Sequence, residues 1–337
     1  MPERILDVET LIVDIPVPGG ILHAVQGTTF HVERGETLCI VGESGCGKSL
    51  TSLAIMDLLP KKAVRSASKL ELDGLSILDV GERRMADIRG DRMGMIFQEP
   101  MTSLNPSYTI GNQLEEAILR HRKVNRDEAR DRAVFLLEKV GITAARSRLP
   151  QYPHQLSGGL RQRVMIAMTL MCGPDLIIAD EPTTALDVTI QAQILLLLAE
   201  LQREFHMGLI LITHDLGVVA RVADRVAVMY AGQIVEEGAA KQVFENPTHP
   251  YTQGLLECIP IPGKTERGAH LGSIPGIVPS LVGNLRGCRF TDRCPYAWSA
   301  CGADDVGLGA GVEAGHKYRC LLSIEQCAEN LKHKVPA

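Results

Sequence analysis

The sequence contains the run Gly42-Glu43-Ser44-Gly45-Cys46-Gly47-Lys48-Ser49, which matches the pattern G-x-x-x-x-G-K-[ST]. The apolar residues 37–41 before it are typical of a strand, and residues 50–59 after it are typical of a helix. In that context the pattern binds nucleotide phosphates, because the glycines let several backbone N–H groups point at one phosphate beside the positive end of a helix. The run predicts an α/β fold with a nucleotide site. The alternative is a glycine-rich turn without a ligand.

Two side chains of this loop have specific expected roles. Lys48 would reach the β- and γ-phosphates, and the Ser49 hydroxyl would bind Mg²⁺. Further along, residues 176–179 form an apolar strand that ends in Asp180 and Glu181. Parallel strands of an open α/β sheet carry their chemistry at this end, so Asp180 would hold Mg²⁺ through water and Glu181 would polarise the attacking water. A solvated turn is the alternative for the two acids.

Three other segments have polar residues at informative places. Residues 93–97 form a strand that ends in Gln98, and residues 209–212 form one that leads to His214, for which a structural histidine is the alternative. Ser157-Gly158-Gly159 opens a helix predicted to run to residue 171. Its exposed N–H groups predict a second anion site, and a capped helix without a ligand is the alternative.

The overall composition narrows the class of protein. The 337 residues suffice for two domains, and 45% hydrophobic with 22% charged residues is ordinary for a globular protein. A net charge of −5 gives no reason to expect a nucleic-acid partner. The sequence shows neither a run of about 18 apolar residues nor a signal-like N-terminus, so a cytosolic chain is expected. Residues 5–15 and 24–32 predict an antiparallel flap, and residues 111–124 and 126–140 predict an inserted helical subdomain.

Five of the nine cysteines lie after residue 287. Four of them are spaced Cys288-x₅-Cys294-x₆-Cys301-x₁₈-Cys320. In a reducing compartment such a group indicates a metal or iron–sulfur site rather than disulfides. The C-x₂-C pairs common in zinc sites are missing, and four thiolates suit a [4Fe–4S] cluster. Zinc and a metal-free segment remain the alternatives.

In their order along the chain, these motifs resemble the nucleotide-binding subunit of an ABC transporter. The matching residues are the phosphate loop at 42–49, Gln98, Ser157 to Gly159, Asp180 with Glu181, Ala185-Leu186-Asp187, and His214. The resemblance implies a RecA-like P-loop NTPase fold with an antiparallel β flap and a helical subdomain at about 99–165. The expected domains are residues 1–245, for this nucleotide-binding domain, and residues 246–337, for a small cysteine-containing domain.

In that family two such domains enclose two ATP molecules, each bound between one subunit's phosphate loop and the other's Ser-Gly-Gly segment. The resemblance implies that Glu181 is the general base, His214 contacts the γ-phosphate, and Gln98 links Mg²⁺ to the helical subdomain. The chain departs from the family at Leu160, where glutamine is usual, and at residues 16–24, which contain no aromatic residue to stack on adenine. His23 or Ile21 would have to replace that aromatic contact.

The C-terminal part is similar to the same region of oligopeptide and dipeptide permease ATPases, in residues 246–252 and 287–297. This resemblance implies an ATPase that powers uptake of di- or oligopeptides, with Cys288, Cys294, Cys301 and Cys320 as ligands of a [4Fe–4S] cluster. The implied partners are a second, different ATPase subunit, two membrane permease subunits and an external solute-binding protein. The chain would lie at the cytoplasmic face of the membrane.

Three other functions are the alternatives. Related permeases carry nickel, glutathione or sugars. ABC-type ATPases that act on DNA carry long coiled coils or zinc modules between the phosphate loop and the Ser-Gly-Gly segment, whereas this interval holds only a short helical subdomain. The third alternative is a cysteine-rich redox or scaffold protein with a vestigial nucleotide site. The presence of Glu181 and His214 argues against it.

Overall fold

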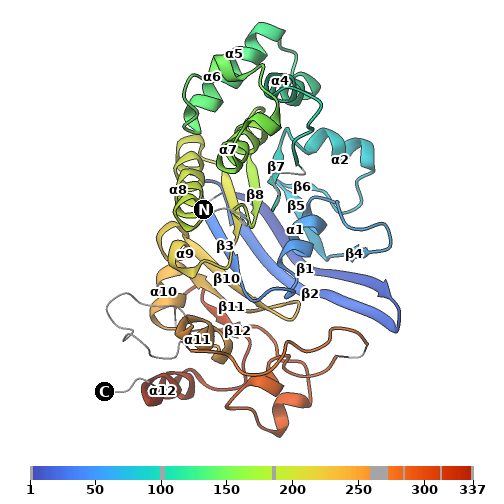
Figure 1. Ribbon diagram of the computed structural model, residues 1–337. Helices are drawn as coiled ribbons and strands as arrows, with labels where there is room; N and C mark the ends of the chain where they lie inside the picture. Colours follow the sequence, from blue (N-terminus) through green and yellow to red (C-terminus); the bar gives the residue numbers. More distant parts are fainter. Residues whose placement is uncertain are drawn as a thin grey trace. The chain divides into compact units, whose positions relative to one another are not determined.

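The computed structural model describes residues 3–98, 103–183, 187–258, 272–283, 285–311 and 313–334 (Figure 1). The chain separates into two compact units. The first comprises Met1–Asp7, His31–Thr37 and Glu71–Ile212, and the second comprises Val8–Phe30, Leu38–Leu70 and Thr213–Ala337. Each unit combines strands and helices, in agreement with the predicted α/β class. The boundary predicted between residues 245 and 246 stays a prediction.

The first unit is built on three parallel strands, β7 (Met93–Ile96), β8 (Leu176–Asp180) and β9 (Gly208–Ile212). β8 lies between the other two, with Ile178 opposite both Met95 and Ile210. Every residue of the three strands is buried, as expected for apolar runs in a parallel sheet covered on both faces. The carboxyl ends of these three strands therefore lie at the same edge of the sheet.

Helices surround these strands. α8 (Val188–Phe205) begins at Asp187, whose side chain accepts a hydrogen bond from the Ile190 N–H and so caps the helix. Ile194, Leu195 and Leu198 of α8 are fully buried. The short α2 (Glu82–Ile88) precedes β7, and β5 (Lys69–Leu72) pairs with β6 (Leu75–Ser76) as an antiparallel hairpin.

The predicted helical subdomain is present in the first unit. α4 (Ile110–His121), α5 (Arg126–Lys139) and α7 (Gly158–Thr169) contact one another (Figure 1). A capping box of Asn125 and Glu128 begins α5 and satisfies N–H groups that have no partner inside the helix. α6 (Ala145–Arg148) and a 3₁₀ turn at Pro153–Gln155 lead to α7.

Most residues of the predicted flap belong to the second unit. The flap is formed by the long strands β1 (Arg4–Val17) and β2 (Gly20–Glu33), which pair with each other, and by β4 (Val64–Ser66), which runs antiparallel to β1. Val8, Leu11 and Val13 of β1 are fully buried. The long strands are interrupted only at the Gly19-Gly20 turn, where both glycines have positive φ.

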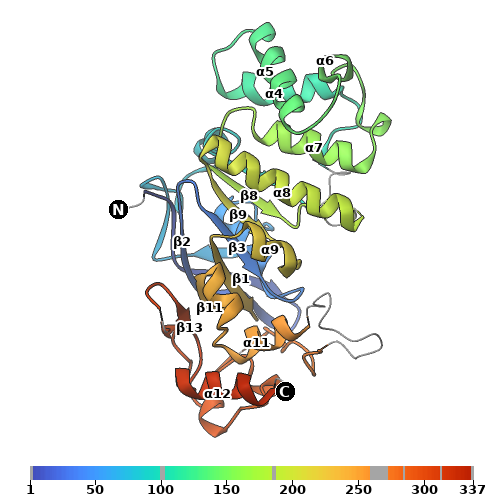
Figure 2. The same cartoon turned by 90° about the vertical axis from the view of Figure 1, so that its left-hand side faces the viewer.

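A second sheet of this unit joins the middle and the end of the chain. β3 (Thr37–Val41) pairs in parallel with β10 (Arg225–Tyr230), which forms an antiparallel hairpin with β11 (Gln233–Ala239). β13 (Lys317–Tyr318) continues the sheet antiparallel to β11 (Figure 2). β12 (Gly309–Ala310) pairs with β13. The C-terminal residues therefore extend the sheet that begins at β3.

The described residues of the second unit also form α-helices. α1 (Lys48–Ile55) follows the phosphate loop, and α9 (Leu216–Val222) precedes β10. α10 (Ala240–Glu245) contacts β11, and α11 (Pro250–Glu257) and α12 (Ile324–Lys334) belong to the C-terminal part.

Among the residues described here, no helix combines the length and the apolar character needed to cross a membrane.

Candidate nucleotide-binding site

The phosphate loop connects the buried strand β3 to α1, as the sequence predicted. The loop needs glycine at two places where backbones approach closely. A Cβ at Gly42 would lie 2.1 Å from the carbonyl oxygen of Met229, and one at Gly47, where φ is 103°, would lie 2.5 Å from that of Ala24. α1 begins directly after Gly47, so its first N–H groups face the loop.

Lys48 is held inside the loop. Its ammonium donates hydrogen bonds to the carbonyl oxygens of Gly42 at 2.8 Å and of Glu43 at 3.0 Å, and the residue is only 4% exposed. Cys46 is buried beside it, and burial raises the pKa of this thiol, which therefore stays uncharged. Ser49 is half-buried at the start of α1, whereas Ser44 and Gly45 are exposed. The arrangement presents one cation and a row of N–H groups to an anion.

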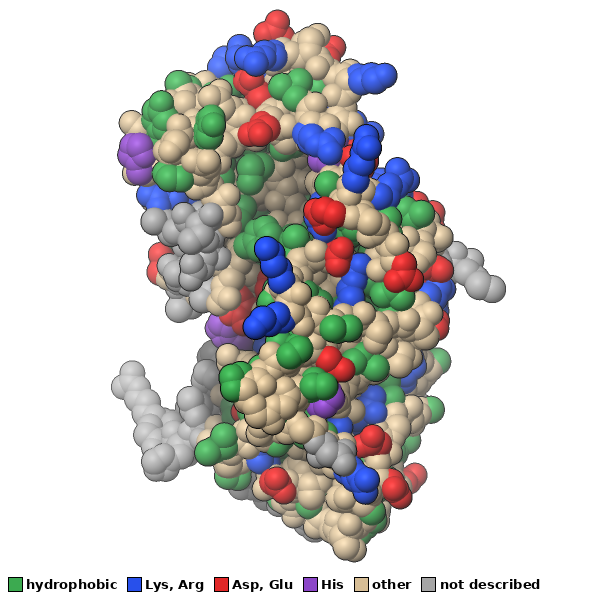
Figure 3. Space-filling view, turned by 90° about the vertical axis from the view of Figure 1, so that its right-hand side faces the viewer, with side chains coloured by type: hydrophobic (Ala, Val, Ile, Leu, Met, Phe, Trp, Pro, Cys, Tyr) green, Lys and Arg blue, Asp and Glu red, His purple; other side chains and the backbone are tan. Residues whose placement is uncertain are grey.

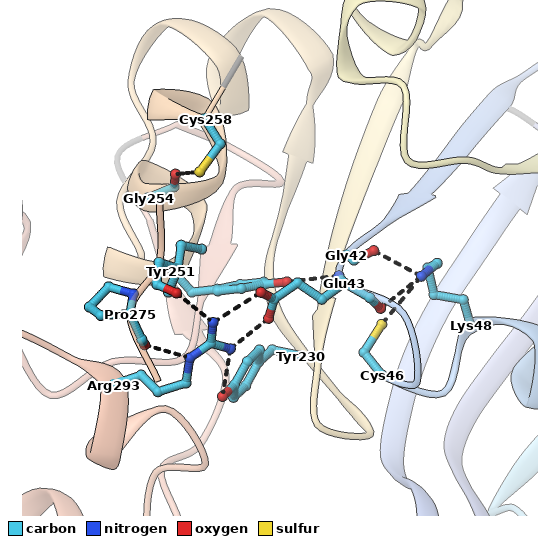
Figure 4. A network of polar contacts seen from close by, with 11 residues as sticks. Gly42, Glu43, Cys46, Lys48, Tyr230, Tyr251, Gly254, Cys258, Pro275 and Arg293 are labelled. Atoms are coloured by element: carbon cyan, nitrogen blue, oxygen red, sulfur yellow. Dashed lines mark hydrogen bonds and ion pairs between the residues drawn. The ribbon is translucent and has the colours of Figure 1, made fainter. Parts of the chain in front are cut away.

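Glu43 is tied to the C-terminal part of the chain (Figure 4). Its two carboxylate oxygens accept hydrogen bonds from Arg293 at 2.6 and 3.0 Å, and its backbone N–H donates to the Tyr251 hydroxyl at 2.9 Å. These contacts were not predicted from the sequence. Arg293 is 250 positions away in the chain, and neither it nor Tyr251 carried a motif that indicated a role at the loop.

His214 belongs to the second unit and is exposed between Thr213 and Asp215. Asp215 caps α9, because its side chain accepts a hydrogen bond from the Val218 N–H at 3.1 Å. This cap defines the backbone directly after His214.

Of the two residues expected to replace an adenine-stacking aromatic, Ile21 is 47% exposed, and His23 has its Nδ1 2.7 Å from a carboxylate oxygen of Asp14.

The first unit brings Gln98 and Glu181 together at the carboxyl edge of its strands. β7 and β8 are parallel neighbours, and the Gln98 amide donates to a Glu181 carboxylate oxygen at 3.4 Å. Asp180 closes β8 and is 6% exposed. Glu181 has a φ of 42° and donates its N–H to the carbonyl of Ile212. A left-handed conformation costs a non-glycine residue about 1–2 kcal/mol, and such strain concentrates at functional positions.

The Ser-Gly-Gly segment begins α7, as predicted. The Ser157 hydroxyl accepts a hydrogen bond from the Leu160 N–H at 3.4 Å, and Ser157 and Gly158 are exposed. An exposed N-terminus of a twelve-residue helix offers N–H groups and a positive dipole end to an anion. Ala185 and Leu186, which the sequence analysis also matched, lie outside the described residues.

The four predicted cluster cysteines line one pocket in the second unit. Cys288, Cys294, Cys301 and Cys320 share it with Phe290, and the Cys288 N–H donates to the carbonyl of Cys301 at 2.7 Å. Burial raises the pKa of Cys294 to about 11, whereas a hydrogen bond with Cys327 lowers the pKa of Cys320 to about 7. All nine cysteines lie in the described part of the chain and are free thiols.

The pocket is not shaped for a single metal ion. Across the described ranges, no three His, Cys, Asp or Glu side chains are placed to hold one metal ion. The predicted [4Fe–4S] cluster stays a prediction.

Comparison with protein families gives two matches. Residues 25–184 match the family "ABC transporter", and residues 235–301 match the family "Oligopeptide/dipeptide transporter, C-terminal region". The second match covers the part of the chain that contains Tyr251, Arg293 and three of the four predicted ligand cysteines.

Relatives align over nearly the full length. The dipeptide transport ATP-binding protein DppD of Bacillus subtilis is 49% identical over 330 residues, which cover 97% of each chain. The oligopeptide transport ATP-binding protein OppD of the same organism is 50% identical over 295 residues, which cover 87% of this chain and 82% of OppD.

Solved structures agree with the fold. The ATP-binding cassette MJ0796, in a dimeric post-hydrolysis state bound to ADP and Pi, superposes with a TM-score of 0.63 at 26% identity, covering 70% of this chain and 98% of that one. Clostridium perfringens cbiO1, part of an ABC transporter complex, gives 0.62 at 30% identity, with coverage of 73% and 92%. The predicted nucleotide-binding fold is confirmed.

Proposed function

Because this chain belongs to the ATP-binding proteins of ABC transporters, in the oligopeptide and dipeptide group, we propose that it hydrolyses ATP to drive peptide import. The observation that carries the proposal is the phosphate loop, where buried Lys48 and the first N–H groups of α1 face one anion site. The relatives named for dipeptide and oligopeptide transport supply the class of cargo.

We assign nucleotide binding to the loop residues 42–49. Their N–H groups and the Lys48 ammonium would bind the β- and γ-phosphates. The Ser49 hydroxyl, the Gln98 amide oxygen and the Asp180 carboxylate are hard oxygen donors of the kind that Mg²⁺ prefers, and Asp180 is shielded from bulk water. When bound, Mg²⁺ supplies positive charge against the phosphate oxygens.

We assign the general base to Glu181. The parallel strands deliver it to the edge where an α/β sheet carries its chemistry, and the Gln98 amide orients its carboxylate. In that position Glu181 would take a proton from the attacking water, and His214 would contact the γ-phosphate.

The exposed start of α7 supports assembly with a second ATPase subunit. Ser157, Gly158 and Gly159 form an anion site on a different helix from α1, so one chain carries two phosphate-binding helix ends. In a pair of subunits, the α7 end of one would complete the nucleotide site of the other. We propose a different ATPase chain as that partner, in keeping with the predicted heterodimer.

A groove in the helical subdomain is suited to the membrane partners. Its lining residues include Asn105, Tyr108, Asn112 and Arg120, and Tyr108 is 54% exposed. Figure 3 views the molecule from the side on which α4 lies in Figure 1, and the surface is hollowed in its upper part. We propose that the contact with the membrane permease falls on this side of the helical subdomain, near residues 98–119. We further propose that the importer has two permease subunits and an external binding protein that delivers the peptide, and that the chain sits peripherally at the cytoplasmic face of the membrane.

We also propose that residues 246–337 form a separate C-terminal domain. We further propose that this domain binds a [4Fe–4S] cluster. The support for the cluster is that all four predicted ligand cysteines line one pocket. Protein purified without oxygen should contain about four iron and four sulfide per chain, and Cys301→Ser should lower both. Cys172→Ser, at a cysteine outside the pocket, is the matched control. Wild-type protein without iron and acid-labile sulfide would refute the cluster.

Uptake of a labelled di- or oligopeptide tests the proposed function. Cells lacking the gene should lose uptake, and wild type should restore it, whereas Lys48→Ala and Glu181→Gln should not. Normal peptide uptake in the deletion strain would contradict the peptide cargo. Uptake of labelled nickel, glutathione and a sugar in the same strain would then identify the solute that is lost.

A further inference from the structure

Glu43 connects three parts of the molecule through three different groups. Its carbonyl oxygen accepts from the Lys48 ammonium at 3.0 Å, its N–H donates to the Tyr251 hydroxyl, and its carboxylate receives both arms of Arg293 (Figure 4). We call Glu43, Tyr251 and Arg293 the tail clamp. The residue that helps to orient the phosphate-binding lysine is thus held in place by the C-terminal part of the chain.

The guanidinium of Arg293 is also held by hydrogen bonds to groups other than Glu43. Besides the two bonds to that carboxylate, it donates to the carbonyls of Pro275 at 3.0 Å and Ile274 at 3.1 Å, and to the Tyr230 hydroxyl at 3.3 Å. These five contacts match the five N–H groups that an arginine carries. The side chain is 4% exposed, and the carboxylate raises the pKa of Arg293, so its charge is permanent. A preorganised fork of this kind sets the position of its partner.

Tyr251 is held just as firmly. It is fully buried, and its ring lies 4.6 Å from that of Tyr230 and 5.4 Å from that of Phe290, measured between centroids. Phe290 in turn lines the cysteine pocket, and Cys294 follows Arg293 directly in the chain. The tail clamp therefore connects the phosphate loop, through Glu43, to residues next to the cysteine pocket.

Stability alone does not account for such a pair. The Arg293 side chain is 4% exposed and the Glu43 side chain 30% exposed, so the pair is part-buried. Replacing a buried ion pair with apolar residues is often neutral or stabilising, and an exposed pair contributes little to stability, so this pair adds little to a fold that packing could hold. What the pair adds is a fixed geometry for Glu43, because two parallel hydrogen bonds define both distance and angle.

We propose that Arg293 and Tyr251 are positioning residues for nucleotide binding, which act through Glu43 to hold the phosphate loop in the conformation that presents Lys48 to the phosphates. This inference rests on the proposed function, since it assigns a role within the same site. It makes the C-terminal part of the chain a determinant of ATP affinity and not only an attached domain.

The test is the dissociation constant of Mg–ATP for the full-length chain, measured by titration calorimetry. Arg293→Ala should weaken binding at least about tenfold, because displacement of a binding group by about an ångström is costly. Arg293→Lys keeps the charge but not the fork and should recover part of the loss. Glu43→Gln should resemble Arg293→Ala, and the double variant should lose no more than either single one.

The matched control is Arg319→Ala. Arg319 also belongs to the C-terminal part, where it donates to the carbonyls of Ile234 and Val306 and makes none of the contacts of the tail clamp. Its removal should lower the unfolding midpoint as Arg293→Ala does, but leave ATP affinity within about twofold of wild type.

The titrations distinguish failure of the positioning role from failure of the proposed function. If Lys48→Ala abolishes binding while Arg293→Ala and Glu43→Gln bind ATP like wild type, the positioning role is wrong and the nucleotide site stands. Equal losses of affinity in Arg293→Ala and Arg319→Ala would also overturn it, because the effect would then follow stability. If the wild-type chain itself does not bind Mg–ATP, the proposed function fails first.

Discussion

His316 Nε2 lies 2.9 Å from a carboxylate oxygen of Glu236, and both side chains are almost completely buried. The same carboxylate accepts the backbone N–H groups of Thr248 and His249, each at 2.8 Å. Glu236 lies on β11, so one buried carboxylate ties this strand to the start of α11 and to the segment that precedes β13. It anchors the C-terminal part to the sheet.

The first prediction concerns this anchor. Glu236→Ala leaves three donors without their buried acceptor and should lower the free energy of unfolding by about 3–5 kcal/mol. His316→Ala removes one donor and should cost about 2 kcal/mol. Urea titration of the full chain measures both, and a Glu236→Ala variant within about 1 kcal/mol of wild type would show that the anchor is not needed.

The second prediction concerns pH. His249 is fully buried, and burial lowers its pKa from 6.5 to about 3. The unfolded chain therefore binds a proton that the folded chain does not, so this contribution to stability is complete above pH 6.5 and is lost as the pH falls toward 3. Each pH unit in that window should cost about 1.4 kcal/mol.

A matched variant isolates the histidine. The His249 Nδ1 accepts the Tyr251 N–H and caps α11, and asparagine at this position keeps a cap without titrating. Unfolding by urea at pH 6.5, 5.5 and 4.5 should give a smaller slope for His249→Asn than for wild type. Identical slopes would exclude His249 as a source of the acid sensitivity.

The third prediction separates binding from hydrolysis. Glu181→Gln keeps the shape of the side chain and its contact with Gln98 but cannot accept a proton. Phosphate release should fall about 100-fold or more, while the dissociation constant for Mg–ATP stays near that of wild type. Hydrolysis at the wild-type rate would remove Glu181 from the role of general base.

The fourth prediction compares two loop glycines. Alanine at Gly47 would place Cβ 2.5 Å from the Ala24 carbonyl, so the loop must move and ATP binding should be lost. Alanine at Gly45 has a similar positive φ of 79° but meets no atom within 4 Å, and it should cost only about 1–2 kcal/mol of backbone strain. Calorimetric titration of both variants with Mg–ATP checks this, and equal losses would show that strain, not the close approach, matters.

The local features of the site were predictable from the sequence. The strand before Gly42 and the helix after Gly47 follow from apolar patterning and glycine placement, although α1 ends at Ile55 and not near residue 59. Asp57, with a φ of 54°, and Pro60 do not continue a helix. The approach of Gln98 to Glu181 follows because neighbouring parallel strands end at the same edge.

The contacts of the C-terminal part were not predictable. β12 and β13 contain two residues each, too few for an alternating pattern to be visible. Arg293 was one of many charged residues in the sequence, and only the folded chain shows that its partner is Glu43. Such contacts depend on the path of the chain through space, which local preferences do not record.

The distance along the chain between Glu43 and Arg293 has a consequence during synthesis. A ribosome adds residues in order, so the phosphate loop leaves it about 250 residues before the arginine that grips it. A nascent or truncated chain that stops before Arg293 carries every residue that should contact the nucleotide. It still lacks the hydrogen bonds that Arg293 donates to Glu43 in the loop. On this proposal, the phosphate loop reaches its ATP-binding conformation only after Arg293 has been synthesised.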